Sequence, residues 1–236
     1  MCNHYRSSGA WRTLMDEFSL TRINPFADLG PARGVNVQGD DLFPGHVGEI
    51  LANHGAGDGS GRLTPQAASW CFMPAQAAGR TSWAEWLKTR RGYNTARGEE
   101  ADRKWPFVFV AKTGRCLIPA EAFFEWDDAP PKTKTGGGKT EYRFSLPDGR
   151  AFMLAGLFGR VEPADAGPML TYTMITKAAG GDTAAIGHGR QPVMLTPDEY
   201  AAWLDPETPI AAFTTRFDPA GTFEARAVKG PKAEAV

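Results

Sequence analysis

The first residues of the chain, Met1-Cys2-Asn3-His4-Tyr5, carry the functional groups with the clearest reactive chemistry. Cys2 follows the initiator Met directly, and its small side chain allows an aminopeptidase to remove Met1. The resulting N-terminal cysteine would carry an α-amine with a pKa near ~7.8 and a thiol with a pKa near ~8.5. Such a pair condenses with an aldehyde, because the amine gives an imine and the thiol then closes a thiazolidine ring. The alternative is that Cys2 is a small buried hydrophobic residue, as free cysteines often are.

Two further side chains are candidates for proton transfer. Glu125 lies between Phe124 and Trp126, and a carboxylate among aromatic rings is desolvated, so its pKa rises and it can act as a general acid or base. Strand alternation offers the opposite interpretation, with both aromatics facing inward and Glu125 facing solvent. His188 lies at a glycine-flanked turn just before an apolar strand, where a side chain can be directed into a cleft.

Residues 88–97 form the only dense basic cluster, and they include Arg91, Asn94 and Arg97. An asparagine can orient a nucleophile or a sugar hydroxyl, and an arginine can hold a phosphate. Composition alone favours a solvated basic face. Trp70 and Phe72 could stack on unpaired bases, but an apolar strand in the core explains them equally well.

Composition limits the partners and the compartment. Lys and Arg number 26 against 27 Asp and Glu, so a basic surface for nucleic acid must be local. The three cysteines have no metal-ligand spacing and no even disulfide set, which indicates a reducing cytosol and predicts neither a metal nor a cofactor. No apolar run reaches membrane-spanning length, so we expect a cytoplasmic protein with no membrane partner.

The hydrophobic pattern predicts more strands than helices. Helices are expected at 9–19, 82–90, from Thr196 onward and at 209–215. Strands are expected at 46–51, 69–74, 115–126 with a hinge at Pro119, 142–146, 151–160, 169–176 and 223–228. Residues 55–61 and 127–141 are expected to be flexible loops.

These elements do not alternate regularly. The sequence therefore predicts a single α+β domain with a mainly antiparallel or mixed β-sheet core and peripheral helices. Its core would span about residues 2–228, with 229–236 as a frayed tail. No pattern in the sequence specifies the order of the strands or the oligomeric state, and we take a monomer as the default.

Several motifs occur together in one order along the chain. They are Met-Cys-Asn at the N-terminus, Trp70 to Pro74, Asn94 to Glu99, Arg115 to Trp126, Ala155 to Leu157, Ile175-Thr176 and His188 to Leu195. This combination resembles the SOS response-associated peptidase (SRAP) family, whose members sense abasic sites in single-stranded DNA. The resemblance covers about residues 2–228. Its most specific segments are Arg-Cys-Leu-Ile-Pro-Ala through Phe-Glu-Trp and His-x-Arg-x-Pro-Val-x-Leu.

The resemblance implies a role for each of the reactive residues. The Cys2 amine and thiol would trap the ring-opened sugar aldehyde of an abasic site as a thiazolidine. Glu125 would transfer protons during imine formation and ring closure. His188 would help to open the sugar ring and assist reversal, and Asn94 would orient the Cys2 end.

The same resemblance implies a set of DNA contacts. Arg97 and Arg190 match positions that contact the DNA backbone, and Trp70 matches an aromatic beside the flipped-out nucleotide. Arg91 and Phe72 extend this predicted surface. The expected partner is single-stranded DNA with an abasic site, which would place the protein at the nucleoid when it is bound.

Three departures from the family pattern concern DNA affinity more than the trapping chemistry. The usual Asn-Ala-Arg is interrupted here, so either Asn94 or Thr95 fills the asparagine position, and we favour Asn94. Many members have Gly-Arg after Cys2, where this chain has Asn3-His4. Phe158 stands where a tryptophan is usual.

Two other functions remain possible at this stage. Cys2, Glu125 and His188 could form a thiol-peptidase set, although only Met1 precedes Cys2 and self-processing beyond its removal would have no substrate. Lyase activity is a further possibility within the family. The second alternative is a non-catalytic single-strand binding module that uses Trp70 and the basic cluster.

Overall fold

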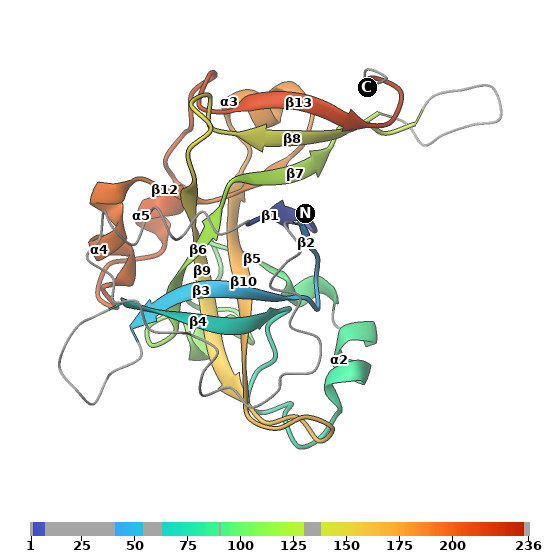
Figure 1. Ribbon diagram of the computed structural model, residues 1–236. Helices are drawn as coiled ribbons and strands as arrows, with labels where there is room; N and C mark the ends of the chain where they lie inside the picture. The colour runs from blue at the N-terminus through green and yellow to red at the C-terminus, as the bar shows by residue number, and fades with distance from the viewer. Residues whose placement is uncertain (1, 8–40, 54–62, 90, 130–137, 234–236) are drawn as a thin grey trace.

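The computed structural model describes residues 2–7, 41–53, 63–89, 91–129 and 138–233, and two β-sheets form most of it (Figure 1). The larger sheet contains β3 (Val47–Asn53), β4 (Leu63–Trp70), β5 (Thr95–Arg97), β6 (Arg115–Ala120), β9 (Phe152–Val161), β10 (Met169–Ala178), β11 (Arg190–Pro192) and β12 (Met194–Leu195). The smaller sheet has the order β13 (Glu224–Lys229), β8 (Glu141–Ser145), β7 (Ala122–Trp126), β1 (Tyr5–Arg6), β2 (Asp41–Leu42).

The larger sheet closes on itself. Its strands follow the order β10-β4-β3-β6-β9, and β9 pairs in turn with β10, so these five strands form a barrel. Most pairs are antiparallel, whereas β4 and β5 both run parallel to β10. The predicted α+β class with a mixed, mainly antiparallel sheet is therefore confirmed.

Alternation along the barrel strands creates two apolar layers. Ile50, Ile118 and Leu154 belong to one buried cluster, which also contains Cys2 and Trp70. A second cluster contains the sequence neighbours of these three residues, and Trp203 and Phe213 cover it. These neighbours are Leu51, Leu117 and Met153. Because successive strand residues point to opposite faces, a strand buried on both faces carries a continuous apolar sequence.

Helices are short and peripheral (Figure 1). They are α2 (Trp83–Thr89), α3 (Gly181–Ala185), α4 (Tyr200–Leu204) and α5 (Ala211–Thr214), with 3-10 turns η1 (Arg91–Tyr93), η2 (Phe107–Phe109) and η3 (Pro197–Glu199). The predicted helix start at Thr196 is confirmed as a capping box with Glu199, although the first turn is 3-10. The predicted helix 82–90 corresponds to α2, with the Ser82 hydroxyl accepting a hydrogen bond from the Glu85 N–H at 3.1 Å.

Three predicted boundaries are wrong. The strand at 69–74 is β4, which begins at Leu63 and ends at Trp70, because Cys71 has φ 124° and leaves the extended conformation. The break between β6 and β7 falls at Glu121, not at Pro119. Pro119 stays in β6 because β3 pairs only with Cys116 and Leu117, so a missing N–H at Pro119 costs that side no ladder bond.

The third correction concerns the C-terminal tail. β13 extends through Lys229, and Lys232 forms an ion pair with the buried Asp127 at 2.9 Å, so this part of the tail is attached to the sheet. The strands β1, β2 and β5 and the helix α3 had no counterpart in the prediction. The predicted helix 9–19, the loop tip 55–61 and the loop residues 130–137 lie outside the described residues.

Candidate active site

Cys2 lies at the end of the N-terminal strand, fully buried beside β7. Tyr5 and Arg6 of β1 pair with Phe123 and Ala122, so the chain start becomes a strand of the smaller sheet. The Cys2 thiol donates a hydrogen bond to the His4 carbonyl oxygen at 3.4 Å. Burial raises the pKa of the Cys2 thiol above its ordinary value, and the nearby Glu125 charge adds to the rise. Cys2 therefore holds its proton at neutral pH.

Glu125 faces the interior of the molecule from β7. Its side chain is 2% exposed, and burial raises the pKa of the carboxyl to about 8. The predicted desolvated carboxylate is thus present, and the solvent-facing alternative is excluded. Alternation still holds along β7, but here it places Glu125 inward, while Phe124 is covered from the other side by the His4 ring at 3.7 Å between centroids.

His188 contacts Glu125 directly. Its Nε2 lies 3.1 Å from Glu125 Oε2, and its Nδ1 lies 2.8 Å from the Trp126 carbonyl oxygen. A carbonyl only accepts, so Nδ1 carries a proton and Nε2 of the neutral ring accepts from Glu125. Burial lowers the pKa of His188, which favours this neutral ring. Glu125 and His188 therefore share one proton near neutral pH.

The turn that presents His188 requires glycine at position 187. Gly187 has φ 81°, and a Cβ there would lie 2.4 Å from the Asp128 carboxylate. A side chain at this position would both strain the backbone and displace Asp128. Gly187 thus lets the loop approach the end of β7 closely enough for His188 to reach Glu125.

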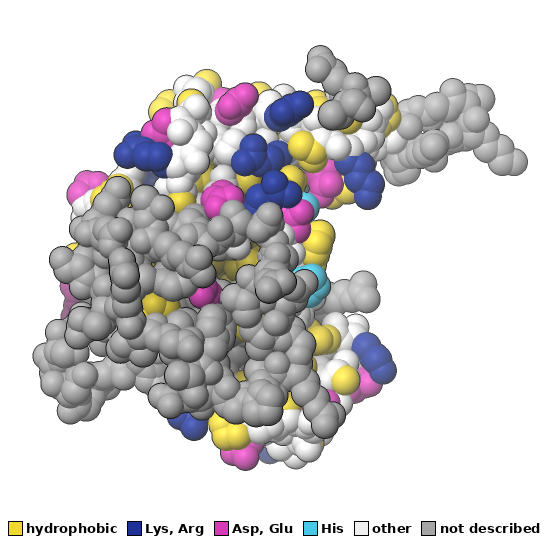
Figure 2. Space-filling model, in the orientation of Figure 1, with side chains coloured by type: hydrophobic (Ala, Val, Ile, Leu, Met, Phe, Trp, Pro, Cys, Tyr) yellow, Lys and Arg dark blue, Asp and Glu magenta, His cyan; other side chains and the backbone are white. Residues whose placement is uncertain are grey.

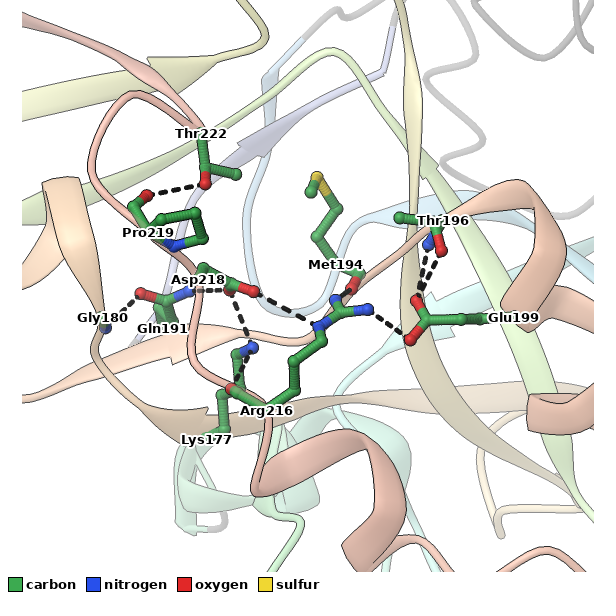
Figure 3. A network of polar contacts seen from close by, with 10 residues as sticks. All are labelled: Lys177, Gly180, Gln191, Met194, Thr196, Glu199, Arg216, Asp218, Pro219 and Thr222. Atoms are coloured by element: carbon green, nitrogen blue, oxygen red, sulfur yellow. Dashed lines mark hydrogen bonds and ion pairs between the residues drawn. The ribbon is translucent and has the colours of Figure 1, made fainter.

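A buried polar network holds both ends of the segment that carries His188 (Figure 3). Lys177 at the end of β10 lies 2.8 Å from Asp218, and both side chains are buried. Gln191 in β11 donates to Asp218 and accepts from the Gly180 N–H at 2.8 Å. Because these contacts join residues before and after the turn, they fix the position of His188.

Asn94 joins the basic segment to the N-terminus. It is fully buried, and its amide nitrogen donates to the Cys2 carbonyl oxygen at 3.0 Å and to the Asn3 side chain. The backbone carbonyl oxygen of Asn94 accepts a hydrogen bond from the Trp70 indole N–H at 2.7 Å. Thr95 is the first residue of β5 and pairs with Met174. Of the two candidates for the asparagine position, Asn94 is the residue that contacts the Cys2 end.

Trp70 and Phe72 do not form an exposed platform. Trp70 has no exposed surface and Phe72 has 1%, and the two rings lie in the two separate apolar clusters. A buried ring has no free face for a base, so the core interpretation of both residues holds in this structure. Trp70 still affects the site, because its indole fixes the backbone at Asn94.

The two predicted backbone arginines differ from each other. Arg97 is exposed, and it lines a cavity of about 190 Å³ together with Thr95, Lys104 and Trp105. Arg190 lines the same cavity, but its guanidinium forms two hydrogen bonds to Glu99, at 2.8 and 2.9 Å. Its charge is therefore balanced within the chain. The side chain of Arg91 lies outside what the structure describes.

A second cavity of about 540 Å³ lies next to the first. Asn3, Cys71 and Lys88 line it, and Gly92 lines both cavities. Because Asn3 neighbours Cys2, this cavity reaches the residue beside the candidate nucleophile. Cys2 itself is fully buried and lines neither cavity.

Sequence reasoning missed the surroundings of His4. The His4 ring lies between the rings of Phe43 and Phe124, at 4.4 and 3.7 Å between centroids. Its nitrogens lie 3.1 Å from Asp41 and 3.3 Å from Glu141. His4 is therefore engaged in holding the N-terminal strand, and no local sequence signal connects it with partners so distant along the chain.

Among the described residues, no group of His, Cys, Asp or Glu side chains is arranged to hold a metal ion. No described helix is long and apolar enough to cross a membrane.

Comparison with known proteins gives a consistent picture. The model of the family described as SOS response associated peptidase (SRAP) matches residues 1–230. The abasic site processing protein YoqW of Bacillus subtilis is 26% identical over 207 residues, covering 88% of this chain and 81% of that protein. The abasic site processing protein HMCES of Gallus gallus is 33% identical over 116 residues, covering 41% and 32%.

Solved structures share the fold over nearly the whole chain. A Bordetella bronchiseptica protein has a TM-score of 0.66 at 25% identity, covering 97% of this chain and 100% of its own. A Bacteroides thetaiotaomicron protein has a TM-score of 0.69 at 19% identity, covering 97% and 92%.

Proposed function

Because this chain belongs to the SOS response associated peptidase (SRAP) family, we propose that it processes abasic sites in DNA by covalent capture on Cys2. Its relatives YoqW and HMCES carry the name abasic site processing protein, which supports the lesion as the substrate. The observation that carries the chemistry is the placement of Cys2 beside a buried Glu125 that shares a proton with His188. The substrate is the ring-opened aldehyde in single-stranded DNA.

The reaction begins once Met1 has been removed and the Cys2 α-amine is free. The amine attacks the sugar aldehyde, and loss of water gives an imine. The Cys2 sulfur then adds to the carbon of the protonated imine as the thiol gives its proton to the Glu125 carboxylate, which closes a thiazolidine. No redox partner is needed, because the only species released is water.

Glu125 supplies the proton that this sequence requires. With a pKa of about 8, its carboxyl is protonated at neutral pH and can protonate the leaving hydroxyl during imine formation. The resulting carboxylate can take the proton from the Cys2 thiol during ring closure. His188 Nε2 accepts the hydrogen bond of the protonated carboxyl at 3.1 Å and so orients Glu125 for this transfer.

The state of the thiol argues against the peptidase alternative. Thiol peptidases depend on a thiolate stabilised by a neighbouring imidazolium, which lowers the pKa of the cysteine. Here burial raises the pKa of Cys2, and His188 Nε2 faces Glu125. In capture the thiol loses its proton only as its sulfur adds to the protonated imine, where the amine has already made the first bond.

Incubation with an oligonucleotide that carries one abasic site tests the proposal. Protein confirmed by intact mass to begin at Cys2 is expected to give a band that survives a denaturing gel. The band should require the lesion, should disappear in Cys2→Ala and should persist in Cys116→Ala, the matched change at another buried cysteine. A plain single-strand binding module would give no such band with any variant, and that result would refute covalent capture.

A further inference from the structure

The outer face of the smaller sheet brings two arginines together without a counter-ion. Arg143 in β8 and Arg226 in β13 are directly opposite each other in the strand register. Within the described part of the chain neither side chain forms an ion pair or a hydrogen bond, and the Nε of Arg143 is buried without a partner. Like charges directly across a sheet destabilise it, so this pair needs an explanation other than folding.

Aromatic and basic side chains continue the same face. Phe124 lies opposite Arg143, and Trp126, two residues further along β7, is half-buried. The Lys229 ammonium lies over the Trp126 ring at 5.9 Å from its centroid. Figure 2 shows several Lys and Arg side chains, with Asp and Glu side chains among them, over the part of the molecule where β7, β8 and β13 lie.

The carboxylates on this face leave the arginines unbalanced. Glu141 is two residues from Arg143, but it contacts the His4 ring at 3.3 Å. Glu224 is two residues from Arg226 on the exposed edge strand, without an ion pair to a described residue. The face therefore has two guanidinium groups and one ammonium group around a partly exposed tryptophan.

This face begins next to the candidate active site. The Trp126 carbonyl accepts the hydrogen bond from His188, and Phe124 and Trp126 flank Glu125 in β7. Neighbouring strands lie about 4.8 Å apart, so Arg143 and Arg226 lie about one and two strand spacings from β7. Cys2 and Glu125 lie on the inner face of this sheet, so a strand captured at Cys2 would pass around the N-terminal end of the sheet to reach the arginines on the outer face.

We propose that Arg143, Arg226, Lys229 and Trp126 form a second contact site for single-stranded DNA that flanks the lesion. The two arginines bind backbone phosphates, where their planar guanidinium groups donate two hydrogen bonds at once, and Trp126 stacks on an unpaired base. This inference rests on the proposed function, because it assigns the flanking part of the same substrate. It also assigns an occupant to the otherwise repulsive Arg143–Arg226 pair.

Binding of an undamaged, dye-labelled single strand, measured by fluorescence anisotropy at several salt concentrations, tests the site. The double variant Arg143→Gln/Arg226→Gln is expected to bind about tenfold more weakly. Each phosphate contact contributes about 0.7 to the slope of log K against log salt for single strands, so the slope should fall by about 1.4. Arg150→Gln/Arg160→Gln removes the same charge from two other positions and should leave the slope nearly unchanged.

An unchanged slope in the Arg143→Gln/Arg226→Gln variant, or an equal fall in the Arg150→Gln/Arg160→Gln control, would overturn the second site. So would a lower thermal midpoint of unfolding in the first variant, because the arginines would then serve the fold. A trinucleotide with an abasic site, too short to span both regions, should crosslink at the wild-type rate in both variants. Failure of the wild-type protein to crosslink any abasic substrate would refute the proposed function and leave the anisotropy result to decide the contact site.

Discussion

Glu125 and His188 resemble each other in one respect, because burial pushes each toward its neutral form. Burial raises the pKa of the carboxyl to about 8 and lowers the pKa of the imidazole from its ordinary 6.5. Between these limits the acid is protonated and the ring is neutral, which is the state that the hydrogen bond to the Trp126 carbonyl supports. In the proposed reaction the Glu125 carboxyl gives up a proton and recovers one within a single turnover.

This assignment predicts a bell-shaped pH dependence for crosslinking. As the pH rises through about 8, Glu125 ionises and the donor for imine formation is lost, so the rate constant should fall. As the pH falls through the pKa of His188, which burial lowers from its ordinary value, His188 protonates and no longer accepts the hydrogen bond that orients the Glu125 carboxyl, so the rate constant should fall again. The profile can be measured as single-turnover rates on an abasic oligonucleotide from about pH 5 to about pH 9.5, a range that spans both limbs.

Glu125→Gln should remove the alkaline limb and reduce the rate by about 10²- to 10⁴-fold, the usual contribution of a general acid or base. The exposed Glu162→Gln is the matched control and should keep both limbs. A rate that rises through the alkaline range would contradict the account, since it would indicate that ionisation of the Cys2 thiol limits the reaction.

At the scale of elements, the site depends on two short segments that carry little regular structure. β1 has two residues, and its pairing with β7 brings Cys2 next to Glu125. The segment between β10 and β11 carries His188 and is fixed at its ends by Lys177, Asp218 and Gln191 (Figure 3). Neither segment could keep its place without contacts to distant parts of the chain.

Removal of Lys177 should therefore affect both stability and activity. Lys177→Met leaves Asp218 buried without its main counter-ion, and loss of one partner of a buried pair costs about 3–5 kcal/mol. Arg216 remains 3.5 Å from Asp218, so we expect about 3 kcal/mol, at the lower end. Urea unfolding measures the free energy, and the crosslinking rate should fall because His188 loses its anchor.

The exposed Lys112→Met is the control, since its Glu207 partner lies at 4.0 Å in solvent and such pairs contribute about 0–1 kcal/mol. The double variant Lys177→Met/Asp218→Leu should recover part of the lost stability, because it removes the uncompensated charge. Equal free energies of unfolding for Lys177→Met and the wild-type protein would contradict the role of this network.

Local signals in the sequence identified the elements that depend on them. The capping box at Thr196 and the apolar runs of β9 and β10 are encoded within a few residues, and both predictions are confirmed. Alternation around Glu125 did not decide whether its side chain faces the core or solvent. His4 covers the outer face of β7, and no pattern within residues 122–126 indicates this contact. Arg190 is held by Glu99, and this ion pair joins residues too far apart along the chain for spacing to reveal.

At the scale of the whole molecule, the two sheets divide the tasks. The closed barrel supplies the buried framework that contains Trp70 and positions Asn94, and the smaller sheet carries Cys2 and Glu125 (Figure 1). With a formal net charge of −1, the chain has no overall attraction for DNA. Attraction for DNA would therefore have to come from local cations such as Arg97.

The measurement that tests covalent capture most directly is the mass of the N-terminal peptide after reaction with an abasic oligonucleotide and digestion of both polymers. The account predicts a peptide that begins at Cys2 and carries the sugar remnant with loss of one water, unchanged by borohydride because a thiazolidine has no C=N bond to reduce. Cys2→Ser, which keeps the amine but lacks the thiol, should give an adduct only when borohydride traps the imine. An adduct on a lysine, or a Cys2 adduct that borohydride reduces, would contradict the thiazolidine.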